Sequence, residues 1–151
     1  MRGDKRKWVC RTPRCHVKMM QLRNIFARPL GNTLMNLDEA LIKDGELRHK
    51  LLAAIAGKHQ LDTKSVAKLD GCALGNWLHG EGERKFPFIK SFRPAVDAHA
   101  AFHAEMEKAA RLINLGEYEQ AEAALASGTP CSRAFVAMVG AVRQLKKDAR
   151  L

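Results

Sequence analysis

The spacing of apolar residues predicts helices along the whole chain that follows residue 30. The first helix carries an apolar residue every three or four positions: Leu34, Leu37, Leu41, Leu47, Leu51, Leu52 and Ile55. Such spacing places one apolar stripe along a helix. Asn32 or Thr33 is expected to cap this helix with a short polar side chain, and Gly57 to end it. Gly45 lies inside it and costs about 1 kcal/mol relative to alanine, which suggests close packing or a weakened turn there.

Four further helices follow from the same kind of pattern. Asp62 or Thr63 is expected to cap the second helix, which runs to about residue 78. The third ends near residue 115 and begins at Pro87 or at Pro94, since a proline deeper inside a helix would bend it. A short helix spans 118–125, and the last spans 132–147. The chain shows no alternating strand pattern, so the predicted class is all-α: an antiparallel four-helix bundle with an additional short helix.

Composition changes this picture in one respect, because the positive charge is uneven. The net charge is +10 over 151 residues, but residues 1–30 hold nine Lys or Arg and one acid, and the rest holds 17 basic and 15 acidic residues. We therefore predict a basic, mostly disordered arm over 1–30 and a nearly neutral folded domain over 31–151. Attraction to nucleic acid would belong to the arm. The chain has neither a secretory signal nor an apolar run of 18 residues, so we expect a cytoplasmic protein without a membrane span.

The clearest chemical signal is the segment HAAFH, which places His99 and His103 four residues apart on a predicted helix. Residues at this spacing share a face, about 5–6 Å apart at Cβ, so their imidazoles can coordinate one ion. A metalloprotease would need glutamate after the first histidine, and this chain has Ala100 there. The competing interpretation is two histidines on a half-buried helix face without a ligand.

Cys72 is the second candidate, in the segment CALGNWLHG. Four cysteines (Cys10, Cys15, Cys72 and Cys131) are scattered along a chain long enough to fold without disulfides, so free, buried or metal-bound thiols are expected. One thiolate and two imidazoles supply three of the four ligands that zinc prefers in a tetrahedron. The competing interpretation of Cys72 is a small buried apolar residue.

The segments from about residue 37 to 147 resemble the chemoreceptor zinc-binding domain (CZB). The resemblance rests on the run Cys72-Ala-Leu-Gly-Asn-Trp77, on His99-Ala-Ala-Phe-His103, and on the segments GEG, AARLINLGEYEQAEAAL and AVRQLKK. It implies a cytoplasmic four-helix module of bacterial signalling that binds Zn²⁺ through Cys72, His99 and His103. The family controls chemotaxis receptors and diguanylate cyclases, and its zinc-bound cysteine senses oxidants such as hypochlorous acid.

The first helix departs from the family pattern at the expected fourth ligand. With Leu51 aligned to the last leucine of the family motif, Asp44 stands where the family has histidine. Carboxylates ligate zinc at about 2.0–2.2 Å, so Asp44 is our predicted fourth ligand. His49 is the rival, but five residues turn a helix by about 140° and place it on another face. Water is the third option.

By this resemblance the chain is a stand-alone zinc-binding sensory or regulatory module. It is expected to pair as a homodimer, to contact a chemoreceptor or another signalling protein, and not to be an enzyme. One alternative is a nucleic-acid-binding protein that acts through its basic arm. Another is a di-iron bundle, for which Glu105 and Glu107 offer too few carboxylates. The remaining candidates are read as incidental: Cys10, Cys15 and His16 in the arm, His59 and His79 on the surface, and Cys131 as a packed thiol.

Overall fold

The computed structural model of the chain describes residues 35–151, and every regular element among them is a helix. The all-α prediction is confirmed for this part of the chain. The predicted arm over 1–30 lies outside the described residues, as do the predicted caps Asn32 and Thr33.

The first described helix is α2 (Leu37–Gly57), and Asn36 caps it. Its side-chain oxygen accepts hydrogen bonds from the backbone N–H groups of Asp38 and Glu39, at 3.1 and 3.2 Å. These satisfy two donors of the first turn that have no partner within a helix. The helix ends as predicted at Gly57, with Lys58 in the left-handed region at φ 50°. The buried stripe of α2 is apolar except at one position, since it consists of Leu37, Ala40, Leu41, Asp44, Leu51 and Ala54.

The prediction of one continuous second helix over 63–78 is wrong. Asp62 caps α3 as expected, but the segment is divided into α3 (Thr63–Ala67), the 3₁₀ turn η1 (Leu69–Gly71), α4 (Ala73–Trp77), the π-helical turn η2 (Leu78–Gly82) and α5 (Glu83–Lys85). The physical cause is that Lys68 and Cys72 adopt extended backbone, with ψ of 107° and 162°. Each interrupts the helical hydrogen-bond ladder.

The remaining helices agree with the sequence more closely. The long helix α6 (Phe92–Asn114) starts just before Pro94, which therefore stands in the first turn, where a missing N–H costs nothing. The short helix α7 (Tyr118–Leu125) has the predicted bounds. The last helix, α8 (Pro130–Ala149), begins two residues earlier than predicted, with Thr129 as its cap and Pro130 in its first turn.

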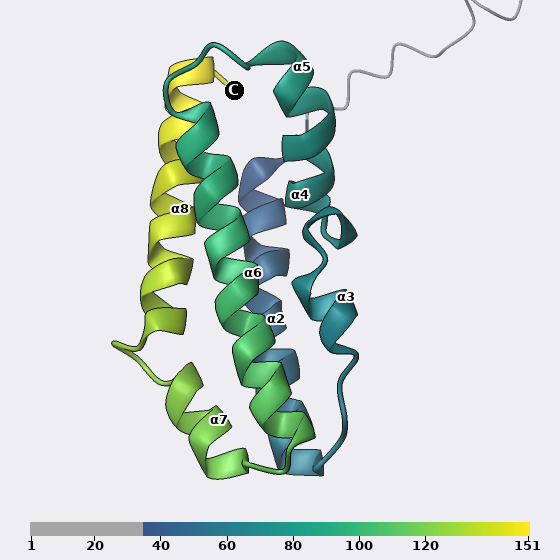
Figure 1. Ribbon diagram of the computed structural model, residues 1–151. Coiled ribbons are helices and arrows are strands. Elements are labelled where there is room, and N and C mark those ends of the chain that lie inside the picture. Colours follow the sequence, from purple (N-terminus) through teal and green to yellow (C-terminus); the bar gives the residue numbers. More distant parts are fainter. Residues whose placement is uncertain (1–34) are drawn as a thin grey trace, which may run out of the picture. The chain divides into compact units, whose positions relative to one another are not determined.

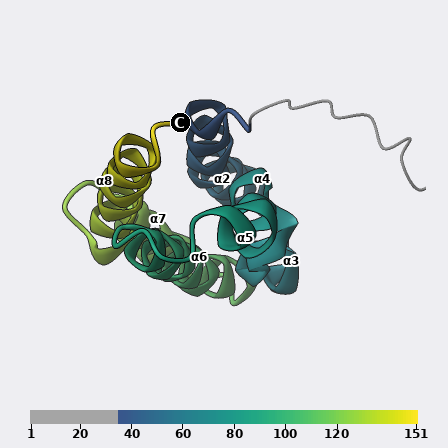
Figure 2. The same ribbon diagram turned by 90° about the horizontal axis from the view of Figure 1, so that it is seen from above.

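These elements form four antiparallel segments around one core. Figure 1 shows α2 running down, α3 to α5 returning, α6 running down and α7 with α8 returning, and the view from above in Figure 2 shows the four segments around a common centre. The helix α6 packs against all the other segments. The predicted bundle is therefore observed, with one of its four segments broken and another formed by two helices. The core consists mainly of leucine, alanine, valine, phenylalanine and methionine side chains, together with Ile113, Trp77 and Cys131. Its largest fully buried members include Phe102, Leu37, Leu51, Leu74 and Met106.

One stretch of the described chain, Tyr118–Ala149, is long and apolar enough by length and composition to cross a membrane. In the structure it consists of α7 and α8 with a break between them, and α8 buries Met138, Val142 and Leu145 in the bundle. Only 22% of its apolar window is buried in the bundle, and length and composition alone are weak evidence for a membrane span.

Candidate metal centre

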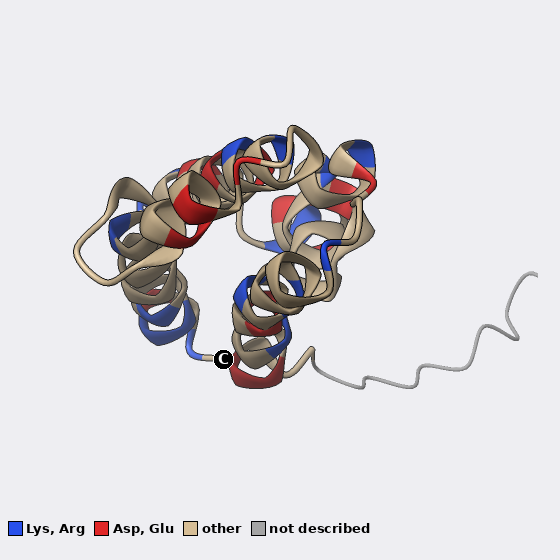
Figure 3. Cartoon of the chain, turned by 90° about the horizontal axis from the view of Figure 1, so that it is seen from below, with Lys and Arg blue, Asp and Glu red and all other residues tan. Residues whose placement is uncertain are grey.

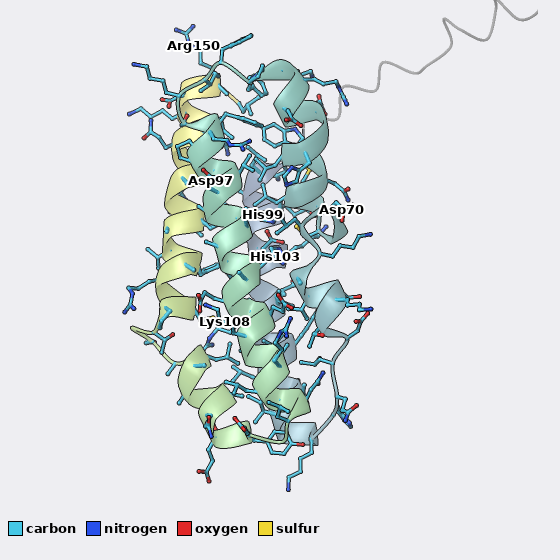
Figure 4. The ribbon with its side chains drawn as sticks, viewed as in Figure 1. Asp70, Asp97, His99, His103, Lys108 and Arg150 are labelled. Carbon is cyan, nitrogen blue, oxygen red and sulfur yellow. The ribbon has the colours of Figure 1, made fainter. Side chains whose placement is uncertain are left out.

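Four side chains with metal-binding atoms converge from three segments of the bundle. Asp44 comes from α2, and Cys72 stands at the start of α4. His99 and His103 lie one turn apart on α6, as Figure 4 shows. One ligand atom from each lies within 4.8 Å of every other. The structure thus brings together the four residues that the sequence analysis selected. Asp44, His99 and His103 are buried and Cys72 is half-buried.

The distances within this cluster resemble the edges of a coordination tetrahedron. Cys72 Sγ lies 3.1 Å from His99 Nε2, and His99 Nε2 lies 3.6 Å from Asp44 Oδ2. Ligand atoms held at 2.0–2.3 Å in a tetrahedron are separated by about 3.3–3.6 Å. The rings of His99 and His103 have centroids 4.6 Å apart and lie 67° out of parallel. Small side-chain movements would bring all four atoms to zinc-ligand distances.

The hydrogen bonding of the polar atoms in the cluster shows whether a cation fits between them. Asp44 Oδ2 and His103 Nε2 are buried and have no hydrogen-bond partner. Leaving a buried polar atom unpaired costs about 1–3 kcal/mol, so such atoms are rare without a function. A cation between them would satisfy both. His99 Nδ1 is likewise unpaired, and because His99 Nε2 faces the cluster, a metal ion there would leave Nδ1 without a partner.

The orientation of His103 is fixed from outside the cluster. Its Nδ1–H donates to the backbone carbonyl of Val66 at 2.8 Å. Val66 lies in the last turn of α3, where carbonyl groups lack helical partners. Because a carbonyl only accepts, Nδ1 must carry the proton, and Nε2 keeps its lone pair for a metal. This is the arrangement by which a ligand histidine is usually oriented.

Cys72 has a double role, because it also caps α4. Its backbone is extended, and its Sγ accepts a hydrogen bond from the N–H of Gly75 at 3.2 Å. Burial raises the pKa of the Cys72 thiol to about 11, and a cation in the cluster would reverse this by binding the thiolate. Burial, helped by His103, lowers the pKa of His99 to about 4, so its imidazole is neutral and able to ligate at neutral pH. Burial also raises the pKa of the Asp44 carboxyl.

Gly75 explains part of the sequence pattern around Cys72. A Cβ at this position would lie 1.5 Å from the carbonyl oxygen of Leu69 and 2.9 Å from Cε1 of His99. No side chain fits between the η1 turn and the His99 ring, so the glycine lets α4 approach α6. Asn76 is exposed, as predicted, while Trp77 is buried.

The other candidates lie away from the cluster. His49 is exposed and borders a groove with Phe135 and Arg143, so it does not replace Asp44. Gly45 also faces this groove, and its missing side chain leaves room for the Phe135 ring, which accounts for the expected close packing.

The prediction that His59 and His79 are surface residues is confirmed, because both side chains are exposed. Cys131 is buried against Met106, with their sulfur atoms 3.7 Å apart. Cys10, Cys15 and His16 lie outside the described residues.

The di-iron alternative finds no support in α6. Glu105 bonds to Lys108 and Glu107 bonds to Arg111, so both carboxylates form ion pairs along their own helix. Neither belongs to the cluster of potential metal ligands.

Sequence reasoning missed two parts of the centre, the Val66 carbonyl and the role of Gly75. A signal existed only for the second, because Gly75 is part of the run Cys72-Ala-Leu-Gly-Asn-Trp77 on which the family resemblance rests.

The fold and the site together define a class: an all-helical domain with a buried cluster of two histidines, one cysteine and one aspartate suited to a metal ion. Comparison of the chain with protein-family models, with curated proteins and with solved structures found no match.

Proposed function

We propose that the chain binds one Zn²⁺ ion through Asp44, Cys72, His99 and His103. The observation that carries this proposal is the convergence of four ligand atoms within 4.8 Å, two of them buried and without a hydrogen-bond partner. Water is not needed as a fourth ligand, because Asp44 supplies one.

The donor set favours zinc over other ions. A thiolate disfavours Mg²⁺ and Ca²⁺, which take oxygen ligands, and imidazole with thiolate in a tetrahedron suits Zn²⁺. Charge supports the same choice. The Cys72 thiolate and the Asp44 carboxylate carry two negative charges and the histidines none, so a divalent ion makes the buried centre neutral. An uncompensated charge at this depth would be costly.

We propose further that zinc occupancy is the signal of a non-enzymatic sensory module of the CZB type in the bacterial cytoplasm. The antiparallel bundle and the placement of the ligands on α2, α4 and α6 support this role. An ion held by three segments stabilises their packing, and its loss changes the same contacts. Oxidation of the half-buried Cys72 thiolate would remove one ligand, which links the site to oxidants. Pairing of two copies and docking to a signalling protein belong to this proposal.

A nucleic-acid role draws no support from the described helices. Figure 3 shows Lys and Arg interspersed with Asp and Glu over them, and the charge excess belongs to residues 1–30.

Metal analysis of the purified chain tests the proposal. We expect about one zinc per chain in the parent, and a loss of zinc in Cys72→Ala, His99→Ala and His103→Ala. His49→Ala and His79→Ala are matched controls, because both histidines are exposed and outside the cluster. A folded parent that contains no zinc and does not bind added zinc at neutral pH would refute the proposal.

A further inference from the structure

A cavity opens directly beside the candidate metal centre, between α2, α3 and η1. Its volume is about 330 Å³, and its wall includes Asp44, Cys72 and His103. The fourth candidate ligand, His99, does not line it and is 0% exposed. An ion held by the four side chains would therefore have one side closed by His99 and another side next to the cavity.

Two of the three buried polar atoms without partners belong to residues that line this cavity. These are Asp44 Oδ2 and His103 Nε2, whereas the third, His99 Nδ1, belongs to a residue outside the wall. A cavity of this volume holds a small molecule with several donor atoms. Such a molecule would approach the ion from the side of Asp44, Cys72 and His103.

The mouth of the cavity carries three lysines, Lys43, Lys50 and Lys68, and one exposed acid, Asp62. Lys43 is paired with Glu39 and Lys68 with Asp70, both outside the cavity wall. Lys50 forms no ion pair with another described residue, so it is the cation most available to an incoming anion.

We propose that this cavity admits small anionic metal ligands, of the polycarboxylate or thiolate class, and that metal enters and leaves the centre by ligand exchange with them. The inference rests on the proposed function, because it requires a bound ion. In the exchange, a donor atom of the incoming anion forms a bond to the ion while the bond from Asp44 breaks. The bonds from Cys72 and the two histidines to the ion then break in turn. The ion departs in the anion's complex, solvent protonates the thiolate, and no electron is transferred.

Release of zinc from the loaded full-length chain tests this proposal with two chelators. The anionic chelator is EDTA, and the neutral one is tetrakis(2-pyridylmethyl)ethylenediamine. With EDTA we expect a release rate that rises with chelator concentration and falls as NaCl is added, because salt screens the attraction to the lysines. With the neutral chelator we expect the rate to be nearly independent of salt.

Charge variants at the cavity mouth sharpen the test. Lys50→Gln is expected to slow release to EDTA about twofold, and Lys50→Glu about fivefold, as expected for one or two unit charges across several ångströms of water. Release to the neutral chelator should stay unchanged in both. Lys108→Gln is the matched control, because Lys108 is an exposed lysine of α6 that does not line the cavity (Figure 4).

The outcomes separate the two proposals. A rate of release to EDTA that does not depend on chelator concentration or on salt means that the ion dissociates before the chelator binds it. That result overturns the exchange route and leaves the proposed zinc site unaffected. Equal slowing in Lys50→Glu and Lys108→Gln also overturns it, since the cavity would have no special role. A parent that carries no zinc overturns the proposed function and the exchange route with it.

Discussion

Replacing Gly75 with alanine places a methyl group where the structure has no room for one. The new Cβ would lie 1.5 Å from the Leu69 carbonyl oxygen, 2.7 Å from the Leu69 carbonyl carbon and 2.9 Å from Cε1 of His99. Two of these atoms belong to the backbone of η1, which cannot turn aside as a side chain does. The third belongs to a candidate ligand, so relief of the clash would move either the η1 turn or His99.

The sign of the change in stability shows whether the steric clash at position 75 outweighs the higher helix propensity of alanine. Propensity alone makes alanine about 1 kcal/mol more stable than glycine within a helix. Overpacking a buried contact costs about 1–3 kcal/mol, and a backbone clash lies at the upper end. We therefore expect Gly75→Ala to lower the free energy of unfolding by about 2 kcal/mol. Gly140→Ala is the matched control, because Gly140 lies within α8 with no atom within 4 Å of a new Cβ. That substitution should stabilise by about 0.5–1 kcal/mol.

Urea unfolding of the metal-free proteins, followed by circular dichroism, measures both effects. With a dependence of about 2 kcal/mol per molar urea, the midpoint should fall by about 1 M in Gly75→Ala and rise by a few tenths of 1 M in Gly140→Ala. Because the new methyl group presses on His99, Gly75→Ala should also bind zinc more weakly. A Gly75→Ala midpoint at or above that of the parent would refute the close approach of η1, α4 and α6 on which the metal centre depends.

Three further predictions concern the metal centre itself. Asp44→Asn should keep the fold and lower zinc affinity at least about tenfold in a competition titration, because the site loses a ligand and a charge; unchanged affinity would remove Asp44 from the ligand set. Asp62→Ala removes the cap of α3, which carries the Val66 carbonyl, and should weaken zinc binding by up to about tenfold. Thr129→Ala removes the cap of α8 instead, costs about 1 kcal/mol of stability and should leave zinc affinity unchanged; equal weakening in both would show a general loss of stability. Removal of zinc should speed amide hydrogen exchange over 68–72 while α8 stays protected, and equal acceleration in both would contradict a local effect.

The sequence was sufficient to place most of the helices and the histidine pair. His99 and His103 follow the same three- and four-residue spacing as Phe102 and Met106 on α6, so the apolar pattern alone puts all four on one buried side. Asp44 shows the same logic in α2, because it lies three residues after Leu41 in the buried stripe. A polar residue on an apolar stripe is a candidate for function even without a family resemblance.

The broken second segment could not be predicted from local pattern. Residues 63–78 have apolar spacing that a continuous helix would satisfy, and nothing in that spacing marks Lys68 and Cys72 as the extended residues. The extended backbone lets Cys72 cap α4 while its sulfur lies 3.1 Å from His99. The hydrogen bond from His103 to Val66 was equally hidden, because every residue has a carbonyl and sequence does not show which one lies nearby.

The apolar core and the candidate metal centre are separate parts of the bundle, and the proposed sensory role depends on that separation. The bundle buries a continuous apolar core, including the side chains of Leu51, Phe102 and Met138, and these contacts do not depend on an ion. A domain of this size does not need a metal to fold, unlike a zinc finger. The ion would instead fix η1 and the start of α4, where the extended residues Lys68 and Cys72 interrupt the helices. Its loss would also leave Asp44 Oδ2 on α2 and His103 Nε2 on α6 without partners. On the proposed function, the change would therefore be centred on the metal site, and a partner protein could detect metal occupancy without unfolding of the bundle.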